Sequence, residues 1–233
     1  MRPYIILHML TTIDGKITGS FLSESIVQEL CDEYYRINRE YKADAFVCGR
    51  ITMEGSFTGG KLVDLSKYIG TNLPFSDYIA KKSSYYAVSI DPHGKLCWYG
   101  SDIKDEDPGY NNAHVIEVLT ESVKKEYLAY LQDKEISYIF CGKEKIDVNL
   151  LNEKLYSIFG IKRLMLEGGG LTDSLFYNEN CIDELSLVQV PIVDTDNKGL
   201  DLFTSKTNNL QNFKLKNIKK LINSGIWLNY IKK

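Results

Sequence analysis

The sequence has few of the residues that build metal sites and disulfide frameworks. Its 233 residues include five cysteines and three histidines, and no two cysteines form a Cys-x-x-Cys pair. An odd number of scattered cysteines is typical of a reducing compartment, whereas disulfide scaffolds and zinc sites need paired or closely spaced ones. We therefore expect a cytoplasmic protein that binds no metal.

Concentrated positive charge and long apolar runs are also missing. The formal net charge is −3, so the chain lacks the basic footprint of a nucleic-acid-binding protein. No apolar run approaches the roughly 20 residues of a membrane-spanning helix, and the N-terminus enters a strand-like run with no signal-peptide pattern. We expect the protein to bind neither nucleic acid nor a membrane, and to act on a small molecule.

The pattern that is present is an alternation of strands and helices. Between residues 114 and 167, apolar runs predict strands at 114–120, 137–141 and 163–167, and amphipathic segments predict helices at 122–132 and 147–159. Such an alternation of strands and helices implies right-handed crossovers and a parallel sheet. Earlier runs predict further strands at 4–10 and 44–48, and the last runs predict an antiparallel hairpin at 213–221 and 226–232. With no repeat or linker, we expect one α/β domain over residues 1–233, with a mostly parallel central sheet flanked by helices.

A helix is predicted after Ser23, which has the side chain of a helix N-cap. Apolar residues then recur at helical spacing, at Ile26, Leu30, Tyr34, Ile37 and Tyr41. We expect one face of this helix to pack on the sheet. A short helix is also expected at residues 76–81, in a loop that covers the pocket.

A glycine-rich turn at residues 167–172 is the strongest functional signal. The apolar run that ends at Leu166 is followed by Glu167, three glycines and an amphipathic segment. Backbone N–H groups without side chains can approach a ligand closely, and at a helix N-terminus they favour an anion such as a phosphate. Glu167 stands at the carboxyl end of the strand, where open α/β sheets bind ligands. The simpler alternative is a glycine-rich turn that binds nothing.

Two other strand ends carry polar groups. Residues 11–16 place hydroxyls, Asp14 and a glycine turn after the first strand, which suits a substrate edge, although a plain hairpin turn is the alternative. Residues 49–54 place a glycine, Arg50 and Thr52 at the start of a helix, where a cation and a hydroxyl can bind a phosphate. The alternative there is a capped helix with a surface arginine.

Together these stretches resemble the pyrimidine reductases of riboflavin biosynthesis, meaning the reductase domain of the bifunctional deaminase–reductase and its stand-alone relatives. The matching motifs cover nearly the whole chain: Thr-Ile-Asp-Gly-Lys-Ile at 12–17, Ala-Asp-Ala-Phe-Val-Cys-Gly at 43–49, Leu-Glu-Gly-Gly-Gly at 166–170, Ile-Asp-Glu-Leu at 182–185 and Gly-Ile-Trp-Leu at 225–228. The resemblance implies a stand-alone member with the dihydrofolate reductase-like fold. It also implies a homodimer that uses NADPH to reduce 5-amino-6-(5-phosphoribosylamino)uracil, converting the ribosyl group to ribityl.

The resemblance assigns the site residues. The glycine turn and the residues after it hold the cofactor phosphates, and the cofactor-binding set is Leu10, Gly49, Arg50, Thr52, Gly168, Gly169, Gly170, Leu171, Thr172 and Asp173. The substrate-binding set is Asp14, Ser23 and Glu167. No catalytic side chain is assigned, because hydride transfer needs no side-chain nucleophile: the protein positions the cofactor against the acceptor and excludes water.

The acceptor is less well defined than the cofactor. Glu40 stands where the family has an arginine, and Ser56 and Phe57 stand where it has acids that an arginine follows, which is missing here. In the family these arginines help to grip the ribose phosphate of the substrate, so the residues for that role are not in register. Two alternatives therefore stay open. One is a reductase of dihydrofolate, a pterin or another small heterocycle on the same fold. The other is a nucleotide-binding protein without catalysis.

Overall fold

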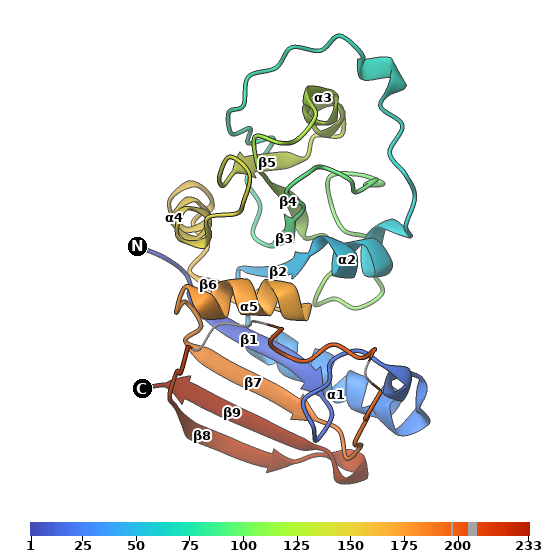
Figure 1. Ribbon diagram of the computed structural model, residues 1–233, viewed down its shortest axis with the longest axis vertical. Coiled ribbons are helices and arrows are strands. Elements are labelled where there is room, and N and C mark those ends of the chain that lie inside the picture. The colour runs from blue at the N-terminus through green and yellow to red at the C-terminus, as the bar shows by residue number, and fades with distance from the viewer. Residues whose placement is uncertain (197, 205–208) are drawn as a thin grey trace. The chain divides into compact units, whose positions relative to one another are not determined.

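The computed structural model describes residues 1–196, 198–204 and 209–233. The chain forms two compact units. Unit 1 contains residues 1–3 and 44–162, and unit 2 contains residues 4–43 and 163–233 (Figure 1). The expectation of a single domain stays a prediction. Within the described ranges, no helix has both the length and the apolar character that crossing a bilayer requires.

Unit 1 is built on a parallel sheet whose strands follow the order β5-β4-β3-β2. These strands are β2 (Ala45–Gly49), β3 (Tyr86–Ile90), β4 (His114–Leu119) and β5 (Ser137–Phe140). Every residue of β3, β4 and β5 is buried, which is typical of parallel strands covered on both faces. The helices and helical turns of the unit are α2 (Arg50–Met53), η2 (Glu54–Thr58), η3 (Ser66–Tyr68), α3 (Lys125–Asp133) and α4 (Val148–Phe159). Asp147 caps α4 by accepting a hydrogen bond from the Leu150 N–H at 3.0 Å.

Unit 2 is built around β1 (Tyr4–Thr11), which pairs in parallel with β6 (Arg163–Leu166) on one side and β7 (Glu184–Gln189) on the other. The strand order is β6-β1-β7-β9-β8, and β9 (Ile226–Lys232) pairs antiparallel with both β7 and β8 (Phe213–Lys220). The predicted α/β fold, mostly parallel with a terminal antiparallel hairpin, is confirmed. The helices and helical turns are η1 (Ser20–Ser23), α1 (Ser25–Glu40), α5 (Gly170–Asn178) and η4 (Ile222–Ser224).

Helix α1 packs one face on the sheet of unit 2, as its periodicity predicts. A cluster of buried side chains joins it to β1, β7 and the turn before β9: Leu10, Phe21, Val27, Leu30, Ile37, Val188, Val190 and Leu221. The helix approaches the last turn closely, because a Cβ on Gly225 would lie 2.5 Å from a methyl carbon of Leu30. The face of β7, β9 and β8 that is turned away from α1 has no helix over it among the described residues drawn in Figure 1.

Two local predictions were wrong. Ser23 does not cap α1: the helix begins after Glu24, and the Ser23 hydroxyl donates to the Ser20 carbonyl at 2.7 Å inside a short 3-10 turn. The expected helix at residues 76–81 is also absent from this described segment. Instead, Tyr78 forms an antiparallel bridge with Tyr138 beside β5, so tertiary pairing satisfies its backbone groups.

Truncating Leu30 tests the packing of α1 on the sheet. Leu30 is 0% exposed, so Leu30→Ala should lower the free energy of unfolding by about 2–5 kcal/mol, because the cavity adds to the lost apolar transfer energy. The matched control is Leu210→Ala, since Leu210 is 90% exposed and its loss should change stability by less than about 0.5 kcal/mol. Urea denaturation measures both, and equal stability of the two variants would contradict the packing described.

Candidate active site

The candidate site of unit 2 lies at the edge where β1, β6 and β7 end. Because these strands are parallel, their carboxyl ends bring three loops together. The loops bond to one another: the Val190 N–H donates to the Thr11 carbonyl and the Ile13 N–H donates to the Ile192 carbonyl, each at 2.8 Å. The glycine turn follows β6 at the same edge. The topology therefore gathers most of the residues predicted from the sequence in unit 2.

Two of the three glycines of the turn are required by the structure around them. Gly168 has φ +85°, and a Cβ there would lie 2.8 Å from the Met9 methyl carbon. A Cβ on Gly170 would lie 2.5 Å from the Asp201 carbonyl oxygen. Gly169 has φ −71°, which any residue can adopt, and the Gly168–Gly169 peptide bond is cis. Packing therefore explains the first and third glycines, whereas the φ of Gly169 does not by itself require a glycine.

Helix α5 begins directly at this turn. The N–H groups of Thr172 and Asp173 donate to the Gly169 carbonyl at 2.8 and 3.0 Å, and Gly169 provides no side-chain cap. The N–H groups of the two residues before them, Gly170 and Leu171, have no partner inside the helix, and N–H groups in this position can bind an anion. Backbone donors at a helix N-terminus are groups of the kind that bind a phosphate, so the predicted role of this turn stays a prediction. Leu171, the second helical residue, is 77% exposed.

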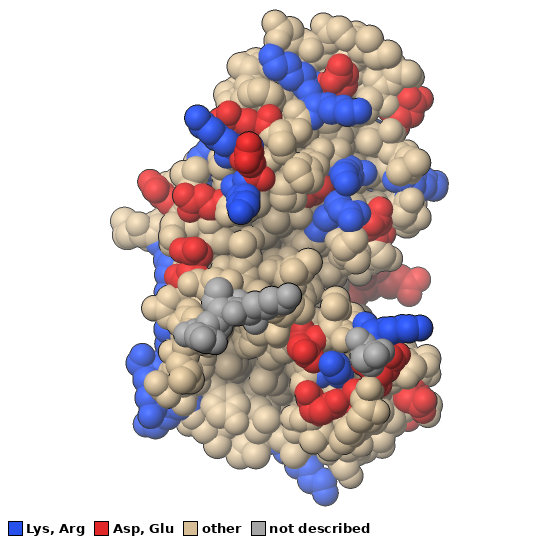
Figure 2. Space-filling view, in the orientation of Figure 1, with Lys and Arg blue, Asp and Glu red and all other residues tan. Residues whose placement is uncertain are grey.

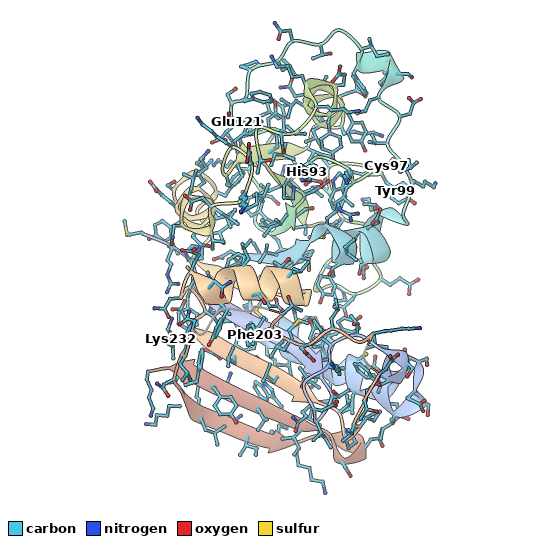
Figure 3. The ribbon with its side chains drawn as sticks, in the orientation of Figure 1. His93, Cys97, Tyr99, Glu121, Phe203 and Lys232 are labelled. Carbon is cyan, nitrogen blue, oxygen red and sulfur yellow. The ribbon has the colours of Figure 1, made fainter. Side chains whose placement is uncertain are left out.

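The segment from residue 198 to 204, which we call the strap, closes one side of the turn. Its Leu202 N–H donates to the Gly15 carbonyl at 3.0 Å, and its Thr204 N–H donates to the Ser174 hydroxyl of α5 at 2.8 Å. The Phe203 ring lies 4.7 Å from the Tyr177 ring of the same helix (Figure 3). The strap thus ties the loop after β1 to the start of α5.

Glu167, which follows β6, is held by a residue that the sequence reasoning missed. Its side chain is buried, and the Asn38 side-chain amide of α1 donates a hydrogen bond to its Oε1 atom. Asn38 itself is 5% exposed. Its position four residues after Tyr34, on the apolar face of the predicted helix, was the signal that could have found it.

Three other predicted residues of unit 2 have ordinary structural surroundings. Asp14 is exposed, and hydrogen bonds from the Thr12 side chain and the Asp194 N–H hold its pKa below the usual value. The Leu10 side chain is 9% exposed and packs in the α1 cluster, so it offers a ligand mainly its backbone. The Ser23 hydroxyl is used within its own turn. The binding roles of all three stay predictions.

The remaining predicted residues belong to unit 1. Gly49 ends β2 and stands at the N-cap of the four-residue helix α2. The Arg50 guanidinium, half-buried, pairs with the Glu54 carboxylate at 2.7 Å, one turn along. Thr52 lies in the same helix and is partly exposed. Their cofactor contacts stay predictions. No three histidine, cysteine or acidic side chains in the described ranges gather as metal ligands would.

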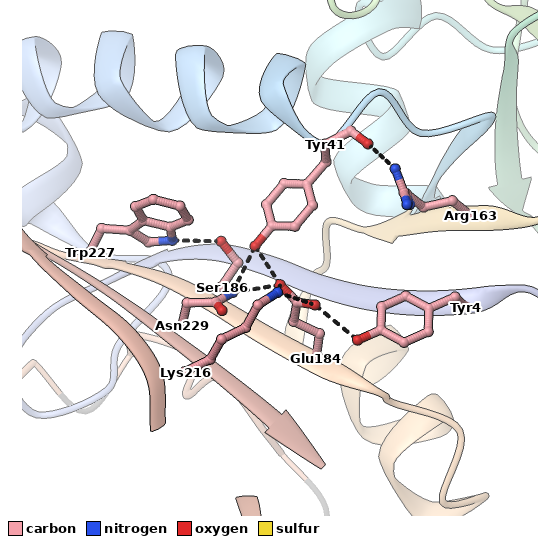
Figure 4. A network of polar contacts seen from close by, with 8 residues as sticks. All are labelled: Tyr4, Tyr41, Arg163, Glu184, Ser186, Lys216, Trp227 and Asn229. Atoms are coloured by element: carbon pink, nitrogen blue, oxygen red, sulfur yellow. Dashed lines mark hydrogen bonds and ion pairs between the residues drawn. The ribbon is translucent and has the colours of Figure 1, made fainter. Parts of the chain in front are cut away.

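A second polar cluster lies at the opposite edge of unit 2, where β1, β6 and β7 begin (Figure 4). The buried Glu184 carboxylate accepts hydrogen bonds from the Tyr4 hydroxyl at 2.9 Å, the Tyr41 hydroxyl at 2.8 Å and the Asn229 amide at 2.6 Å. Burial raises the pKa of Glu184, but these donors outweigh it and keep the pKa below its usual value. Lys216, the extra residue of a β-bulge in β8, points its ammonium group at the same carboxylate at 3.4 Å.

This cluster explains the Asp-Glu motif at residues 183 and 184 structurally. Asp183 accepts the Ile5 N–H at 2.8 Å, while Glu184 ties β7 to β1 and β9, so the motif clamps strands together at the amino edge. Glu40 lines the same edge, beside cavities of about 260 and 320 Å³, and pairs with Arg36. The departure from the family pattern at Glu40 therefore lies at the amino edge, not at the edge that carries the glycine turn.

Comparisons with known proteins agree with this arrangement. A family model described as the RibD C-terminal domain matches residues 110–226, which is 117 of 233 residues. The chain is 27% identical over 194 residues to the 2,5-diamino-6-ribosylamino-4(3H)-pyrimidinone 5′-phosphate reductase of Methanothermobacter thermautotrophicus, covering 83% of this chain and 80% of the relative. It is 25% identical over 196 residues to the reductase of the same name from Aquifex aeolicus, covering 82% and 78%.

Solved structures show the fold. A pyrimidine reductase-like protein from Corynebacterium diphtheriae has a TM-score of 0.69 at 17% identity, covering 99% of this chain and 92% of that one. A riboflavin biosynthesis reductase from Saccharomyces cerevisiae has a TM-score of 0.65 at 14% identity, covering 100% and 90%. The predicted dihydrofolate reductase-like fold is confirmed. With the family model spanning half of the sequence, the chain belongs to the RibD C-terminal domain family.

Proposed function

We propose that this protein is an NADPH-dependent pyrimidine reductase of riboflavin biosynthesis. The observation that carries the proposal is the bare backbone of Gly169 at the N-terminus of α5, next to the buried carboxylate of Glu167. Membership of the RibD C-terminal domain family and the names of the relatives support the same chemistry, and the family implies a nicotinamide cofactor. We further propose a cytoplasmic location, supported by five free cysteines.

The residues of the chain would bind and orient the reactants. The turn and first helical residues, Gly168–Asp173, would hold the cofactor diphosphate, with Gly49 and Thr52 as further contacts, and Arg50 favours NADPH over NADH because its guanidinium suits a 2′-phosphate. The bound nicotinamide supplies the hydride. Reducing a ribosyl group to ribityl also places a proton on the ring oxygen that C1′ releases. Glu167, with Asp14 and Ser23, would contact the substrate.

Two pyrimidines are candidate acceptors. The relatives are named for 2,5-diamino-6-ribosylamino-4(3H)-pyrimidinone 5′-phosphate, which keeps the 2-amino group. The resemblance of the sequence points to 5-amino-6-(5-phosphoribosylamino)uracil, which has lost it. Both carry the ribosylamino phosphate that is reduced, so the same hydride geometry serves either. We propose the diamino compound as the preferred acceptor, because the relatives named for it match about four fifths of this chain.

The direct test follows the oxidation of NADPH by absorbance with each pyrimidine and with dihydrofolate. The expected result is turnover with the diamino compound, slower turnover with the uracil and none with dihydrofolate. Turnover with dihydrofolate alone would replace the substrate proposal with the pterin alternative. NADPH binding without turnover on any acceptor would favour the non-catalytic alternative.

A Gly169→Asp variant tests where the cofactor binds. The φ of Gly169 is one that any residue adopts, so the backbone should keep its conformation, but the added negative charge should weaken NADPH affinity by at least about 100-fold through repulsion of the phosphates. The matched control is Gly100→Asp in unit 1, where a Cβ meets nothing within 4 Å. Isothermal titration calorimetry measures both, and unchanged affinity in Gly169→Asp would remove the phosphate site from this turn.

The Asn38 amide should position Glu167, because it donates a hydrogen bond to the buried carboxylate. In Asn38→Asp, this donor is replaced by a second carboxyl group, and two carboxyl groups that share one site repel each other when both are ionised. We expect kcat/KM to fall about 10- to 100-fold at neutral pH, with the acid limb of the pH profile moved upward. The control is Asn72→Asp, an exposed amide whose oxygen accepts from Lys125. A wild-type pH profile in Asn38→Asp would contradict the role.

We also propose that the protein forms a homodimer through the uncovered face of β7, β9 and β8. Cross-strand pairing aligns apolar side chains on that face in two rows: Leu185, Tyr230 and Leu215, and Leu187, Leu228 and Ile218. Leu215 and Ile218 are 45% and 58% exposed. The sheet-bearing part of unit 2 is mostly uncharged in Figure 2, with lysines toward its margin. A contiguous apolar patch of this kind favours burial against a second copy.

Leu187→Lys tests the dimer. A lysine in the centre of the face should convert the protein to a monomer in light-scattering measurements, because burying an unpaired ammonium group is costly. Leu210→Lys changes an exposed leucine of the same unit in the same way and should leave the assembly intact. A monomeric wild-type protein, or a dimeric Leu187→Lys, would refute this interface.

A further inference from the structure

An unpartnered acid is buried in the first turn of α5. The Asp173 side chain is 0% exposed, and neither of its carboxyl oxygens has a hydrogen-bond partner among the described residues. Buried polar groups are almost always paired, so an orphan carboxyl needs an explanation. Helix capping does not provide one. Asp147 at the start of α4 accepts a backbone N–H, whereas the Asp173 carboxyl accepts none.

Asp173 lies directly behind the glycine turn. A Cβ built on Gly168 would lie 3.6 Å from the Oδ2 atom of Asp173. The same Cβ would lie 2.8 Å from the methyl carbon and 3.0 Å from the sulfur of Met9 in β1. The Asp173 N–H donates to the Gly169 carbonyl at 3.0 Å, so the acid belongs to the turn that offers its backbone donors to an anion. Its charge would therefore lie beneath the proposed phosphate position.

Among the residues that the structure describes, no neighbouring charge compensates the acid. Burial alone raises the pKa of Asp173 well above its ordinary value. The charged groups on the elements around the turn have other partners: Lys16, from the loop after β1, pairs with Asp201 of the strap at 2.6 Å, and Glu167 accepts from Asn38. On α5 itself, the neighbouring Ser174 hydroxyl donates to the Gly170 carbonyl. A carboxyl group without donors or cations is stable in this position only as the neutral acid.

We propose that Asp173 is a positioning residue whose proton is required for dinucleotide binding at the glycine turn. In its neutral form the acid leaves the positive potential of the α5 N-terminus intact, and in its ionised form it opposes the cofactor phosphates. Each binding event to the ionised protein takes one proton from solvent, which forms the O–H bond of the Asp173 carboxyl. This inference rests on the proposed function, because it assumes that the turn binds a dinucleotide.

The sign of the pH effect follows from linkage. Because the ligand binds the protonated form, the dissociation constant should be constant below the pKa of Asp173 and should rise about tenfold per pH unit above it. In Asp173→Asn, an uncharged isostere, the dissociation constant should not change with pH. The raised pKa also means that ionisation opposes folding, so at pH 8 Asp173→Asn should melt at a higher temperature than the wild type.

The experiment measures binding of NADH and NADPH by calorimetry between about pH 6 and 9, in two buffers of different ionisation enthalpy. NADH is included because the 2′-phosphate of NADPH itself titrates near pH 6. The expected result is uptake of up to one proton by the wild type at the alkaline end and none by Asp173→Asn. Asp32→Asn, the same change at an exposed residue of α1, should behave as the wild type.

The outcomes separate this inference from the proposed function. If the wild type binds neither dinucleotide at any pH, the proposed cofactor site fails. If it binds NADH with no proton uptake and a pH-independent dissociation constant, the role of Asp173 is overturned, and this result needs no variant. A pH slope that persists in a folded Asp173→Asn protein overturns it as well.

Discussion

The parallel pairing of β1 with β6 and β7 is the constraint on which unit 2 depends. It brings the chain ends after residues 11, 166 and 189 to one edge, where the loops hydrogen-bond to one another. It also brings the chain starts to the other edge, where Glu184 joins β1, β7 and β9. The two edges therefore differ: one is held together by a buried carboxylate with several donors, and the other carries the glycine turn, where we propose that a ligand binds.

The glycine turn shows how packing and function share one short stretch. Gly168 is needed for its positive φ and for contact with Met9, and Gly170 is needed because the strap carbonyl of Asp201 lies against it. These contacts fix the backbone at both ends, so that Gly169 is presented without a side chain at the N-terminus of α5. In the proposed site, backbone donors fixed in this way would bind an anion without reorganising, and the proton on Asp173 would set the potential that the anion meets.

Most of the fold was predictable because its signals are local. Apolar runs and helical periodicity predicted β1, β2, β4 to β6, α3 and α4 to within a few residues, and the terminal hairpin pairs as expected. The two errors had different causes, one distant in the chain and one local. Tyr78 pairs with Tyr138, sixty residues away, instead of forming a helix, and Ser23 uses its hydroxyl in a 3-10 turn that the helix pattern does not reveal.

The sequence by itself determined the class of the fold, the glycine turn and the family resemblance, because periodicity and turn chemistry depend on residues that are close together in the chain. Only the tertiary structure decided what the isolated polar residues do. Asn38 reaches Glu167 across 129 positions, and Glu184 meets Tyr4 across 180, which no local pattern encodes. Asp173 looked like one more residue of a phosphate turn. Its burial without a partner appears only once Gly168, Met9 and the strap are packed around it.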